Sequence, residues 1–320
     1  MPEPIRIELP TVFGMKTVNS YLFLEPEPTL VDCGEKTGAS WHALQKALGK
    51  HNLTIKDIAR IYITHAHIDH MGMAGEIVKH SDATVWVSEY VYNWAVNLEI
   101  EQQKRRKLIQ SVIEKNIDLN TSSFGRNFSS LFSGFKEYWD VIPEDRVLKF
   151  ELNGYVKLGG EAWEVVYAPG HCINQTCFYH PDSGQLLSAD MLLMVTPSPV
   201  IEASLHPPYE REKSLAVLLD SYEKFSKMDI ARVYPGHYES YENVKELIQS
   251  QVQRIHNRKE VCFDLIQSGK HTFMELLNEL YKNRVSFPAV PMLVGYLDLL
   301  LEEGRIFNRK ENGIFTYHAA

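Results

Sequence analysis

The chain has 320 residues, which exceeds the usual size of a single domain and is enough to bury a full hydrophobic core. Its net charge of -8 provides no overall attraction for nucleic acid or for an anionic membrane. The sequence has no apolar stretch long enough to span a bilayer, and it does not start with a basic segment followed by an apolar one. We therefore expect a cytoplasmic protein with one large and one small domain.

The four cysteines agree with a reducing compartment. They form no CxxC pair and no small-scaffold disulfide pattern, and their positions are Cys33, Cys172, Cys177 and Cys262. We expect buried free thiols. Cys172 follows a candidate ligand, His171, but its spacing matches no zinc-thiolate motif, and we assign it no role.

The first third of the chain alternates extended and helical segments. Runs rich in apolar and β-branched residues predict strands at residues 5–9, 21–24, 29–32, 58–64 and 84–87. Helical periodicity predicts helices at residues 40–48 and 73–80. This alternation indicates an α/β or mixed architecture.

From about residue 89 to residue 139 the pattern changes to long helical stretches, which predicts a helical insertion. Its basic run, Lys104 to Lys107, is expected to be a solvated helix face. Its aromatic residues are expected to pack the insertion on the core, and they are Phe124, Phe128, Phe132, Phe135, Tyr138 and Trp139.

Strands are expected again after the insertion, at residues 146–152, 155–158, 161–168, 176–179, 185–189 and 231–234. A proline-rich loop, residues 196–208, and a helix, residues 210–226, separate the last two. From about residue 242 the chain is mostly helical. We therefore place a domain boundary there, between residues 1–241 and residues 242–320.

The most informative segment directly follows the predicted strand at residues 58–64. Within six residues it carries four potential metal ligands, His65, His67, Asp69 and His70. Imidazole and carboxylate together suit zinc and its first-row neighbours, whereas calcium and magnesium favour oxygen alone. In an extended loop His65 and His67 point to the same side and can converge on one metal. Asp69 and His70 then face a second one.

Three later residues complete the candidate site, and each follows a predicted strand. They are His171, Asp190 and His237. A Pro-Gly pair precedes both histidines and provides a sharp exit from the strand. Because strand ends meet at one rim of a sheet, these side chains can converge with the earlier motif.

This ordered set of ligands resembles the metallo-β-lactamase superfamily, with its HxHxDH motif, later histidine, later aspartate and final histidine. The resemblance covers about residues 5 to 240 and implies an α+β fold, a four-layer αββα sandwich with the site at one edge of the two sheets. It also implies that His65, His67 and His171 hold a first metal, that Asp69, His70 and His237 hold a second, and that Asp190 bridges them. Asp32 resembles an early aspartate of the family that supports the ligand loop from outside the ligand set.

The resemblance further implies a hydrolase with two zinc ions, although iron or manganese can use the same ligands. The nucleophile would be a metal-bridging hydroxide, and Asp69 or Asp190 would orient it and transfer its proton. Beyond Asp190, the proline-rich loop is long enough to overhang the metals. Its His206 and Tyr209 are candidate substrate contacts.

Asp190 indicates the branch of the superfamily. Zinc β-lactamases tend to carry cysteine or serine at this position, whereas glyoxalase II-like, lactonase-like and nuclease-like members carry aspartate. The 46 residues between Asp190 and His237 are too few for the large nuclease insertion of the β-CASP branch. We expect a small-molecule ester, thioester or lactone as the substrate, with an iron-dependent sulfur dioxygenase as a further alternative.

Residues 242–320 are expected to form three helices, at 242–266, 273–281 and 289–303, and a hairpin of residues 305–308 and 314–317. This order resembles a winged helix. The β-lactamase-like 2 type proteins carry such a domain, and some act on single-stranded RNA. Two alternatives follow, a zinc phosphodiesterase or endoribonuclease and a non-catalytic nucleic-acid-binding regulator.

The charges of this segment disfavour nucleic acid. Residues 288–303, which would enter a groove, contain no lysine or arginine and three acidic residues. The whole segment balances ten basic residues against ten acidic ones. An accessory domain that packs on the catalytic body, walls the pocket or forms a homodimer contact is the preferred interpretation.

Overall fold

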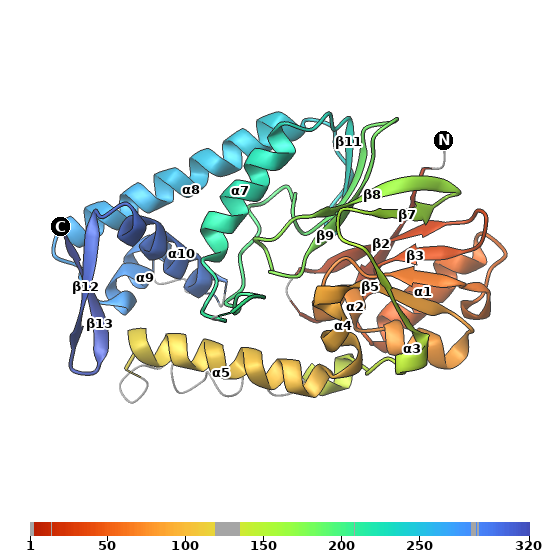
Figure 1. The fold of residues 1–320 in the computed structure, drawn as a ribbon, viewed down its shortest axis with the longest axis horizontal. Coiled ribbons are helices and arrows are strands. Elements are labelled where there is room, and N and C mark those ends of the chain that lie inside the picture. The colour runs from red at the N-terminus through yellow and green to blue at the C-terminus, as the bar shows by residue number, and fades with distance from the viewer. Residues whose placement is uncertain (1–2, 14, 119–134, 208, 283–285, 287) are drawn as a thin grey trace.

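A computed structural model describes residues 3–13, 15–118, 135–207, 209–282, 286 and 288–320. Two β-sheets form the centre of the part of the molecule shown on the right of Figure 1, and helices cover their outer faces. A helical region that includes the C-terminal segment extends to the left.

The first sheet has the strand order β1-β2-β3-β4-β5-β6. Its first three strands pair antiparallel, and the pairs from β3 to β6 are parallel. The strands are β1 (Ile5–Pro10), β2 (Thr17–Phe23), β3 (Thr29–Val31), β4 (Arg60–Tyr62), β5 (Thr84–Ser88) and β6 (Val147–Phe150).

The second sheet has the strand order β11-β10-β9-β8-β7, in which only the β10–β11 pair is parallel. Its strands are β7 (Tyr155–Leu158), β8 (Glu161–Tyr167), β9 (Thr176–His180), β10 (Gln185–Ala189) and β11 (Arg232–Pro235). Every residue of β9 and β10 is buried, as expected for strands covered on both faces.

Large aromatic side chains fill the space between the two sheets. Phe23 of the first sheet meets Trp163 of the second at a ring distance of 5.8 Å, and Tyr62 meets Phe178 at 6.0 Å. These edge-to-face pairs are the preferred arrangement of aromatic rings. They hold the two sheets together where their strand ends carry the candidate ligands.

The outer helices complete the layers. The first sheet is covered by α1 (Gly38–Gly49), α3 (Ala74–His80) and α4 (Glu89–Val96), and the second by α7 (Ser214–Ser226) and part of α8 (Val244–Gln267). The connections between strands of the first sheet also contain shorter helical elements, namely η1 (Ile55–Asp57), α2 (Ile68–Met71) and η4 (Glu144–Arg146). None of the helices in the described ranges is both long and apolar enough to cross a membrane.

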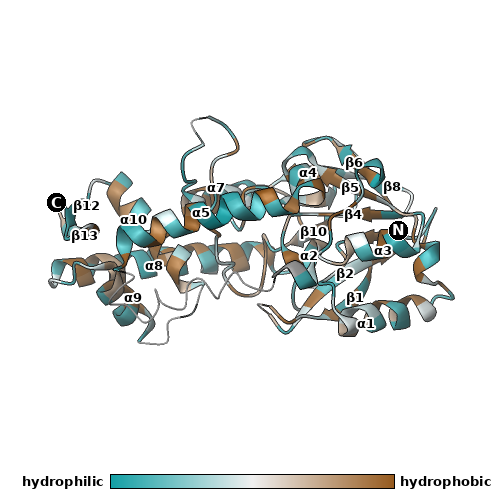
Figure 2. Cartoon of the chain, turned by 90° about the horizontal axis from the view of Figure 1, so that it is seen from below, coloured by the Kyte–Doolittle hydropathy of each residue, from teal (hydrophilic) through white to brown (hydrophobic). Residues whose placement is uncertain are grey.

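The predicted insertion contains α4, α5 (Leu98–Asn116) and η3 (Phe135–Tyr138). Helix α5 runs along one side of the molecule from α4 to the C-terminal hairpin (Figure 1). It exposes hydrophilic residues on its outer side (Figure 2) and buries Ile109, Val112 and Ile113. The predicted packing residues Phe124, Phe128 and Phe132 lie outside the described residues.

The C-terminal segment has the predicted order of elements, with α8, α9 (Phe273–Tyr281), α10 (Ala289–Glu302), β12 (Ile306–Glu311) and β13 (Ile314–Ala319). Its hydrophobic core continues into the rest of the chain, because Leu293 of α10 and Leu215 of α7 belong to one cluster. The Tyr317 hydroxyl also donates to Asn116 Oδ1 of α5 at 2.5 Å. The division at residue 241 and the winged-helix-like domain stay predictions.

Several predicted boundaries differ from the structure, among them that of β2, predicted at 21–24 and observed at Thr17–Phe23. The helix predicted at 210–226 begins only at Ser214, because Arg211 pairs with Ala203 in a short antiparallel bridge. The helix predicted at 73–80 begins at Ala74, and a separate turn of helix, α2, precedes it. Helix α2 carries Asp69 and His70, so two of the candidate ligands lie on a helix rather than in an extended loop.

Candidate metal centre

The loop after β4 is fixed against the second sheet. The backbone N–H and the hydroxyl of Thr176 both donate to Thr64 O at 2.9 Å. The N–H of Ala66 donates to Asn174 Oδ1 at 3.1 Å. These contacts place His65 and His67 at the edge where the strands of both sheets end.

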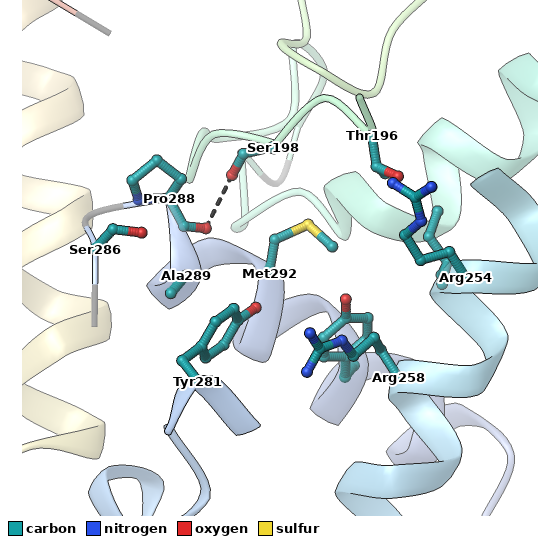
Figure 3. A pocket seen from close by; sticks show the side chains of 11 residues that line it. Thr196, Ser198, Arg254, Arg258, Tyr281, Ser286, Pro288, Ala289 and Met292 are labelled. Carbon is teal, nitrogen blue, oxygen red and sulfur yellow. Dashed lines mark hydrogen bonds between the residues drawn. The ribbon is translucent and has the colours of Figure 1, made fainter. Parts of the chain in front are cut away.

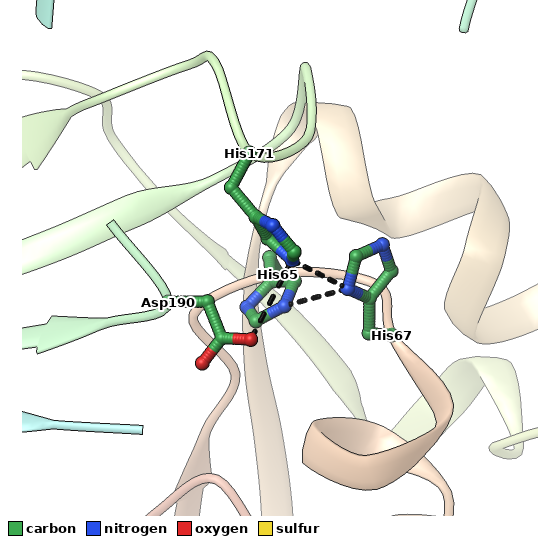
Figure 4. A group of neighbouring side chains, drawn as sticks. All are labelled: His65, His67, His171 and Asp190. Carbon is green, nitrogen blue, oxygen red and sulfur yellow. Dashed lines mark hydrogen bonds and ion pairs between the residues drawn. The ribbon is translucent and has the colours of Figure 1, made fainter. Parts of the chain in front are cut away.

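The first group of ligand atoms belongs to His65, His67, His171 and Asp190, which lie within 4.8 Å of one another (Figure 4). His67 Nδ1 is 3.1 Å from His65 Nε2 and 2.9 Å from His171 Nε2. Zinc–nitrogen bonds of roughly 2.0–2.1 Å in tetrahedral geometry place ligand nitrogens at about this separation. The convergence therefore fits a bound metal ion.

The second group contains Asp69, His70 and His237. His237 Nε2 lies 3.3 Å from Asp69 Oδ2, and His70 Nε2 lies 3.9 Å from the same oxygen. Helix α2 supplies two of these side chains, and the loop after β11 supplies the third. The structure thus brings this second set of predicted ligands together beside the first.

The carboxylate of Asp190 lies between the two groups. Its Oδ2 is 3.5 Å from His171 Nε2 of the first group and 3.4 Å from His237 Nε2 of the second. Its Oδ1 is 3.3 Å from His70 Nε2. One carboxylate can therefore contact cations in both groups.

Asp32, at the end of β3, orients two of the imidazoles. Its Oδ2 is 2.8 Å from His70 Nδ1, and its carboxylate also accepts from the backbone N–H and the hydroxyl of Thr64. Thr64 Oγ1 in turn lies 3.0 Å from His65 Nδ1. With both Nδ1 atoms engaged, the Nε2 atoms of His65 and His70 are left to face a metal. Thr64 was missed by sequence reasoning, although it directly precedes His65.

The two later histidines have backbone partners. His171 Nδ1 lies 2.9 Å from Ser198 O, and His237 Nδ1 lies 2.5 Å from Thr17 O. Each carbonyl accepts the Nδ1 proton and leaves Nε2 free to bind a metal. Ser198 and Thr17 are 27 and 220 positions away from their histidines, so no local sequence signal identifies them.

The Pro-Gly exit before His237 has a steric reason. A Cβ atom at Gly236 would overlap Asp190 Oδ1 and approach His70. The N–H of Asn19 donates to Gly236 O at 2.7 Å, and its side-chain amide donates to Pro235 O at 2.9 Å. Strand β2 thereby holds the loop that carries His237, and the bare backbone of Gly236 leaves room for the ligands.

Burial and neighbouring charged groups keep the histidines of the first group neutral. Burial lowers the pKa of His65 well below its ordinary value, and the nearby His70 and His67 lower it further. The pKa of His67 is also well below its ordinary value because of burial, His171 and Arg105. Neutral imidazole is the form that binds metal.

Carboxylates dominate the second group. Burial alone would lower the pKa of His237, but Asp190 and Asp69 raise it to about 10. Burial would raise the pKa of Asp69, but His70 and His237 lower it to about 2. The group therefore favours positive charge, which a proton or a metal cation can supply.

Two buried polar atoms at the centre of the site lack a hydrogen bond among the described residues, which supports the fit of a metal. Among the described residues, His70 Nε2 and Asp190 Oδ1 are buried and form no hydrogen bond of acceptable geometry. Buried polar atoms are normally satisfied. A cation between these atoms would satisfy both, and the mixture of nitrogen and carboxylate oxygen suits a first-row divalent ion.

A cavity of about 770 Å³, the metal pocket, opens over these ligands. Its wall includes apolar side chains from distant parts of the chain, among them Trp94, Ile109, Trp139 and Leu193. The first part of the proline-rich loop, residues 196–200, also lines it, as expected from the length of this loop.

Arg105 is a wall residue that sequence reasoning placed wrongly. It belongs to the basic run that was expected to be a solvated helix face, but its side chain is only 18% exposed. It pairs with the buried Glu202, and its guanidinium lies 4.2 Å from the centre of the Trp94 ring. This contact fixes α5 against the proline-rich loop.

The predicted substrate contacts His206 and Tyr209 are not among the residues that line the metal pocket. After Glu202 the loop turns back on itself, because Ser204 N donates to Glu210 O and Glu212 N donates to Glu202 O. This turn carries Tyr209 outward, where it is 62% exposed. Their role as substrate contacts stays a prediction.

Fold and site together define a class of metal-dependent enzymes in which a two-sheet sandwich carries histidine and aspartate ligands at its strand ends. The family model described as metallo-beta-lactamase superfamily matches residues 14–237. The chain belongs to this superfamily. The expected fold and the expected class of enzyme, a hydrolase of this superfamily, are thereby confirmed.

Individual relatives extend the likeness over the whole chain. The chain is 26% identical over 313 residues to the probable metallo-hydrolase YqjP of Bacillus subtilis, covering 94% of this chain and 93% of the relative. The metallo-beta-lactamase family protein TTHA1429 of Thermus thermophilus aligns with a TM-score of 0.80 and 23% identity, over 100% of this chain and 99% of its own. A beta-lactamase domain protein from Burkholderia ambifaria gives a TM-score of 0.81 and 20% identity, over 100% and 93%. The two structures share the fold with the C-terminal segment included.

Proposed function

We propose that the chain is a dinuclear metal-dependent hydrolase that acts on a small-molecule ester, thioester or lactone. The observation that carries this proposal is the position of Asp190, whose carboxylate lies between two groups of converging ligand atoms. His65, His67 and His171 would hold one ion, and Asp69, His70 and His237 the other. Zinc is the proposed metal, and the same ligands also accept iron or manganese.

When bound, two such metals would supply Lewis acidity that activates a water molecule near neutral pH and polarises the scissile carbonyl. The protein supplies the remaining functions. Asp69 is 15% exposed and lines the metal pocket, so its carboxylate can accept and return a proton there. Asp32 and the backbone carbonyls behind the histidines keep the imidazoles oriented, which reduces reorganisation during the reaction.

The shape of the metal pocket supports a small-molecule substrate. Its volume of about 770 Å³ falls in the range of roughly 300–1,000 Å³ that is common for ligand pockets. Its apolar wall residues include Trp94 of α4, Ile109 of α5 and Leu193 of the loop after β10, and the other lining residues of α5 are polar: Glu99, Gln102, Gln103, Arg105 and Arg106. Such a wall suits an acyl group next to a polar leaving group.

The C-terminal segment does not favour the nucleic-acid alternatives. Helix α10, the counterpart of a recognition helix, is buried at most of its positions, including Leu293, Leu297 and Leu300. It therefore has little free surface to enter a groove. These observations favour catalysis on a small molecule over both the endoribonuclease and the non-catalytic regulator.

Metal analysis of protein purified without added metal tests the dinuclear site. We expect two ions per chain in the wild type and about one in His237→Ala, since this variant removes a ligand of the second group alone. His256→Ala, on the exposed side of α8, is the matched control and should keep both ions. A wild-type protein that binds a single ion under saturating metal would contradict the dinuclear assignment.

A panel of thioester, lactone and phosphodiester substrates, with a short single-stranded RNA, tests the substrate class. We expect turnover of a thioester or lactone that is lost on chelation and in Asp190→Ala. Asp182→Ala, in the exposed turn between β9 and β10, is the matched control and should retain activity. Metal-dependent cleavage of the RNA without ester hydrolysis would overturn the proposal in favour of the endoribonuclease.

A further inference from the structure

A second, smaller cavity of about 210 Å³ lies beside the metal pocket. The two cavities share the wall residues Thr196, Ser198 and Pro288. Since a water molecule occupies roughly 30 Å³ of liquid, the smaller cavity has room for an ionic group of several heavy atoms. We call it the arginine pocket, because Arg254 and Arg258 of α8 form one side of it.

The two arginines lie one helical turn apart and direct their guanidinium groups toward the arginine pocket (Figure 3). Within the described part of the chain, neither has a carboxylate within 4.0 Å. Other cations nearby are paired, as Lys259 is with Glu303 and Arg305 is with Glu260. In a chain with a net charge of -8, two guanidinium groups without carboxylate partners make this pocket locally positive.

The remaining lining groups also favour an anion. The described side chains around the pocket include no carboxylate, but they include the hydroxyls of Thr196 and Tyr281. Thr196 Oγ1 is buried and has no hydrogen-bond partner among the described residues. One N–H of Arg258 donates to Leu280 O at 2.8 Å, which holds this side chain in place and leaves its other donors to a ligand.

The arginine pocket is also connected to the metal centre through one residue. The hydroxyl of Ser198 donates to Pro288 O at 3.0 Å, on the wall between the two cavities. The carbonyl oxygen of the same residue accepts from His171, a candidate ligand. A molecule that reaches from the metals past Ser198 would therefore enter the arginine pocket.

We propose that the arginine pocket binds a phosphate group of the substrate, a small ester or thioester whose scissile bond lies at the metal centre. This inference rests on the proposed function. Phosphate fits better than carboxylate, because its additional oxygens and higher charge match two forked guanidinium donors and a free hydroxyl. Hydrolysis adds water across the acyl bond and releases a carboxylic acid and an alcohol or thiol that keeps the phosphate.

Calorimetric titration of the metal-loaded protein with inorganic phosphate tests the pocket directly. We expect Arg254→Gln and Arg258→Gln each to weaken binding at least about fivefold, since each removes a charge-assisted hydrogen bond. Lys245→Gln makes the same change of charge at an exposed position of α8 outside the pocket and should leave the affinity unchanged. Phosphate that binds only at the metals would be insensitive to both arginine variants, and this result would overturn the proposal.

A matched pair of thioesters tests the connection to catalysis, namely S-acetylpantetheine and S-acetyl-4′-phosphopantetheine. We expect a higher kcat/KM for the phosphorylated thioester and a smaller ratio between the two in Arg254→Gln. Equal kcat/KM values for the two thioesters would overturn the assignment to the substrate while leaving the hydrolase proposal intact. If neither thioester nor any other ester is hydrolysed but phosphate binding still depends on the arginines, the proposed function fails and the phosphate pocket stands.

A binding experiment with RNA tests whether the phosphate group that the arginine pocket recognises belongs to a nucleic acid instead of a small molecule. A short single-stranded RNA whose binding depends on Arg254 and Arg258, when inorganic phosphate does not bind, would overturn the small-molecule assignment. Circular dichroism of each variant shows that the fold is retained, which we expect because both arginines are exposed.

Discussion

Two regions of the site differ in where their residues lie in the sequence. We call them the edge, which is the sheet edge that carries the candidate metal ligands, and the wall, which lines the metal pocket. At the edge, His65, His67, Asp69 and His70 come from one short segment, and the other ligands follow strands of the adjoining sheet. The wall combines side chains from α4, α5, the loop after β10 and the start of α10, which lie far apart in the sequence. A long-range contact, that of Arg105 with Glu202, joins α5 to the proline-rich loop in this wall.

Because of this difference, we expect the edge to determine the reaction and the wall to determine substrate specificity. The edge is supported by two sheets and their shared aromatic interior, so its geometry is hard to change without unfolding the protein. The wall can be altered one contact at a time. We therefore expect substitutions at the edge to abolish metal binding and turnover, and substitutions in the wall to change substrate preference while metal is retained.

The largest effect is expected at the edge. His65→Ala removes a nitrogen of the first group, and the transition-state stabilisation of several kcal/mol that such a metal supplies should be lost. This corresponds to a decrease in kcat/KM on the order of 10³-fold or more on the best ester substrate. Metal content by mass spectrometry should fall in parallel. Full activity with a lowered metal content would contradict this comparison, because the reaction would then not depend on the metal bound at the edge.

In the wall, Arg105→Met should weaken substrate binding and destabilise the fold, while both metals stay bound. It leaves the buried Glu202 carboxylate with the N–H of Ile173 as its one remaining partner among the described residues, which costs about 3 kcal/mol in the free energy of unfolding. Denaturant unfolding and KM measure the two effects. Lys104→Met on the exposed side of the same helix is the control and should change neither. A loss of metal in Arg105→Met would show that edge and wall are not independent.

A smaller effect than that of Arg105→Met is expected from the residues that support the ligands. Thr64→Val removes the hydroxyl between Asp32 and His65 and should lower metal affinity about tenfold, as measured by competition with a chelator. Thr64→Ser keeps the hydroxyl and should restore most of the affinity. Equal affinities of the valine and serine variants would mean that the hydroxyl does not orient His65.

The smallest effect is expected at the C-terminal end of α5, away from the residues that line the metal pocket. Tyr317→Phe removes the hydrogen bond to Asn116 and should lower the free energy of unfolding by about 1 kcal/mol without changing kcat or KM. A thermal-unfolding scan and steady-state kinetics measure both. A change in KM of the size expected for Arg105→Met would contradict this ranking.

The convergence of the candidate ligands at one edge was predictable from sequence because most of them carry a local signal. Motif spacing identified His65 to His70, and a strand followed by Pro-Gly identified His171 and His237. The central sheets were predictable for a related reason, since β9 and β10 are short apolar runs next to a clear turn at residues 181–184. The limits of β2 were not, because its first residues are selected by pairing with β1 rather than by their own composition.

The wall could not be predicted, because its contacts join residues that have no common pattern. Arg105 and Glu202 are 97 positions apart, and within its basic run Arg105 resembles any solvated residue. The choice of His206 and Tyr209 relied on their place in a long loop. The backbone pairing of Ser204 with Glu210 turns that part of the loop away from the metal pocket, and composition does not reveal such a turn.

We also expect Ser198 to couple metal binding in the metal pocket to ligand binding in the arginine pocket. Its carbonyl accepts from His171 and its hydroxyl donates to Pro288, so a shift of α10 reaches a candidate metal ligand through a single residue. A ligand that holds Pro288 in one position and a metal that holds His171 in one position then affect each other's affinity. Linkage requires this coupling to be reciprocal. The protein should therefore bind its metal more tightly, or less tightly, by the same factor by which metal changes the affinity of that ligand.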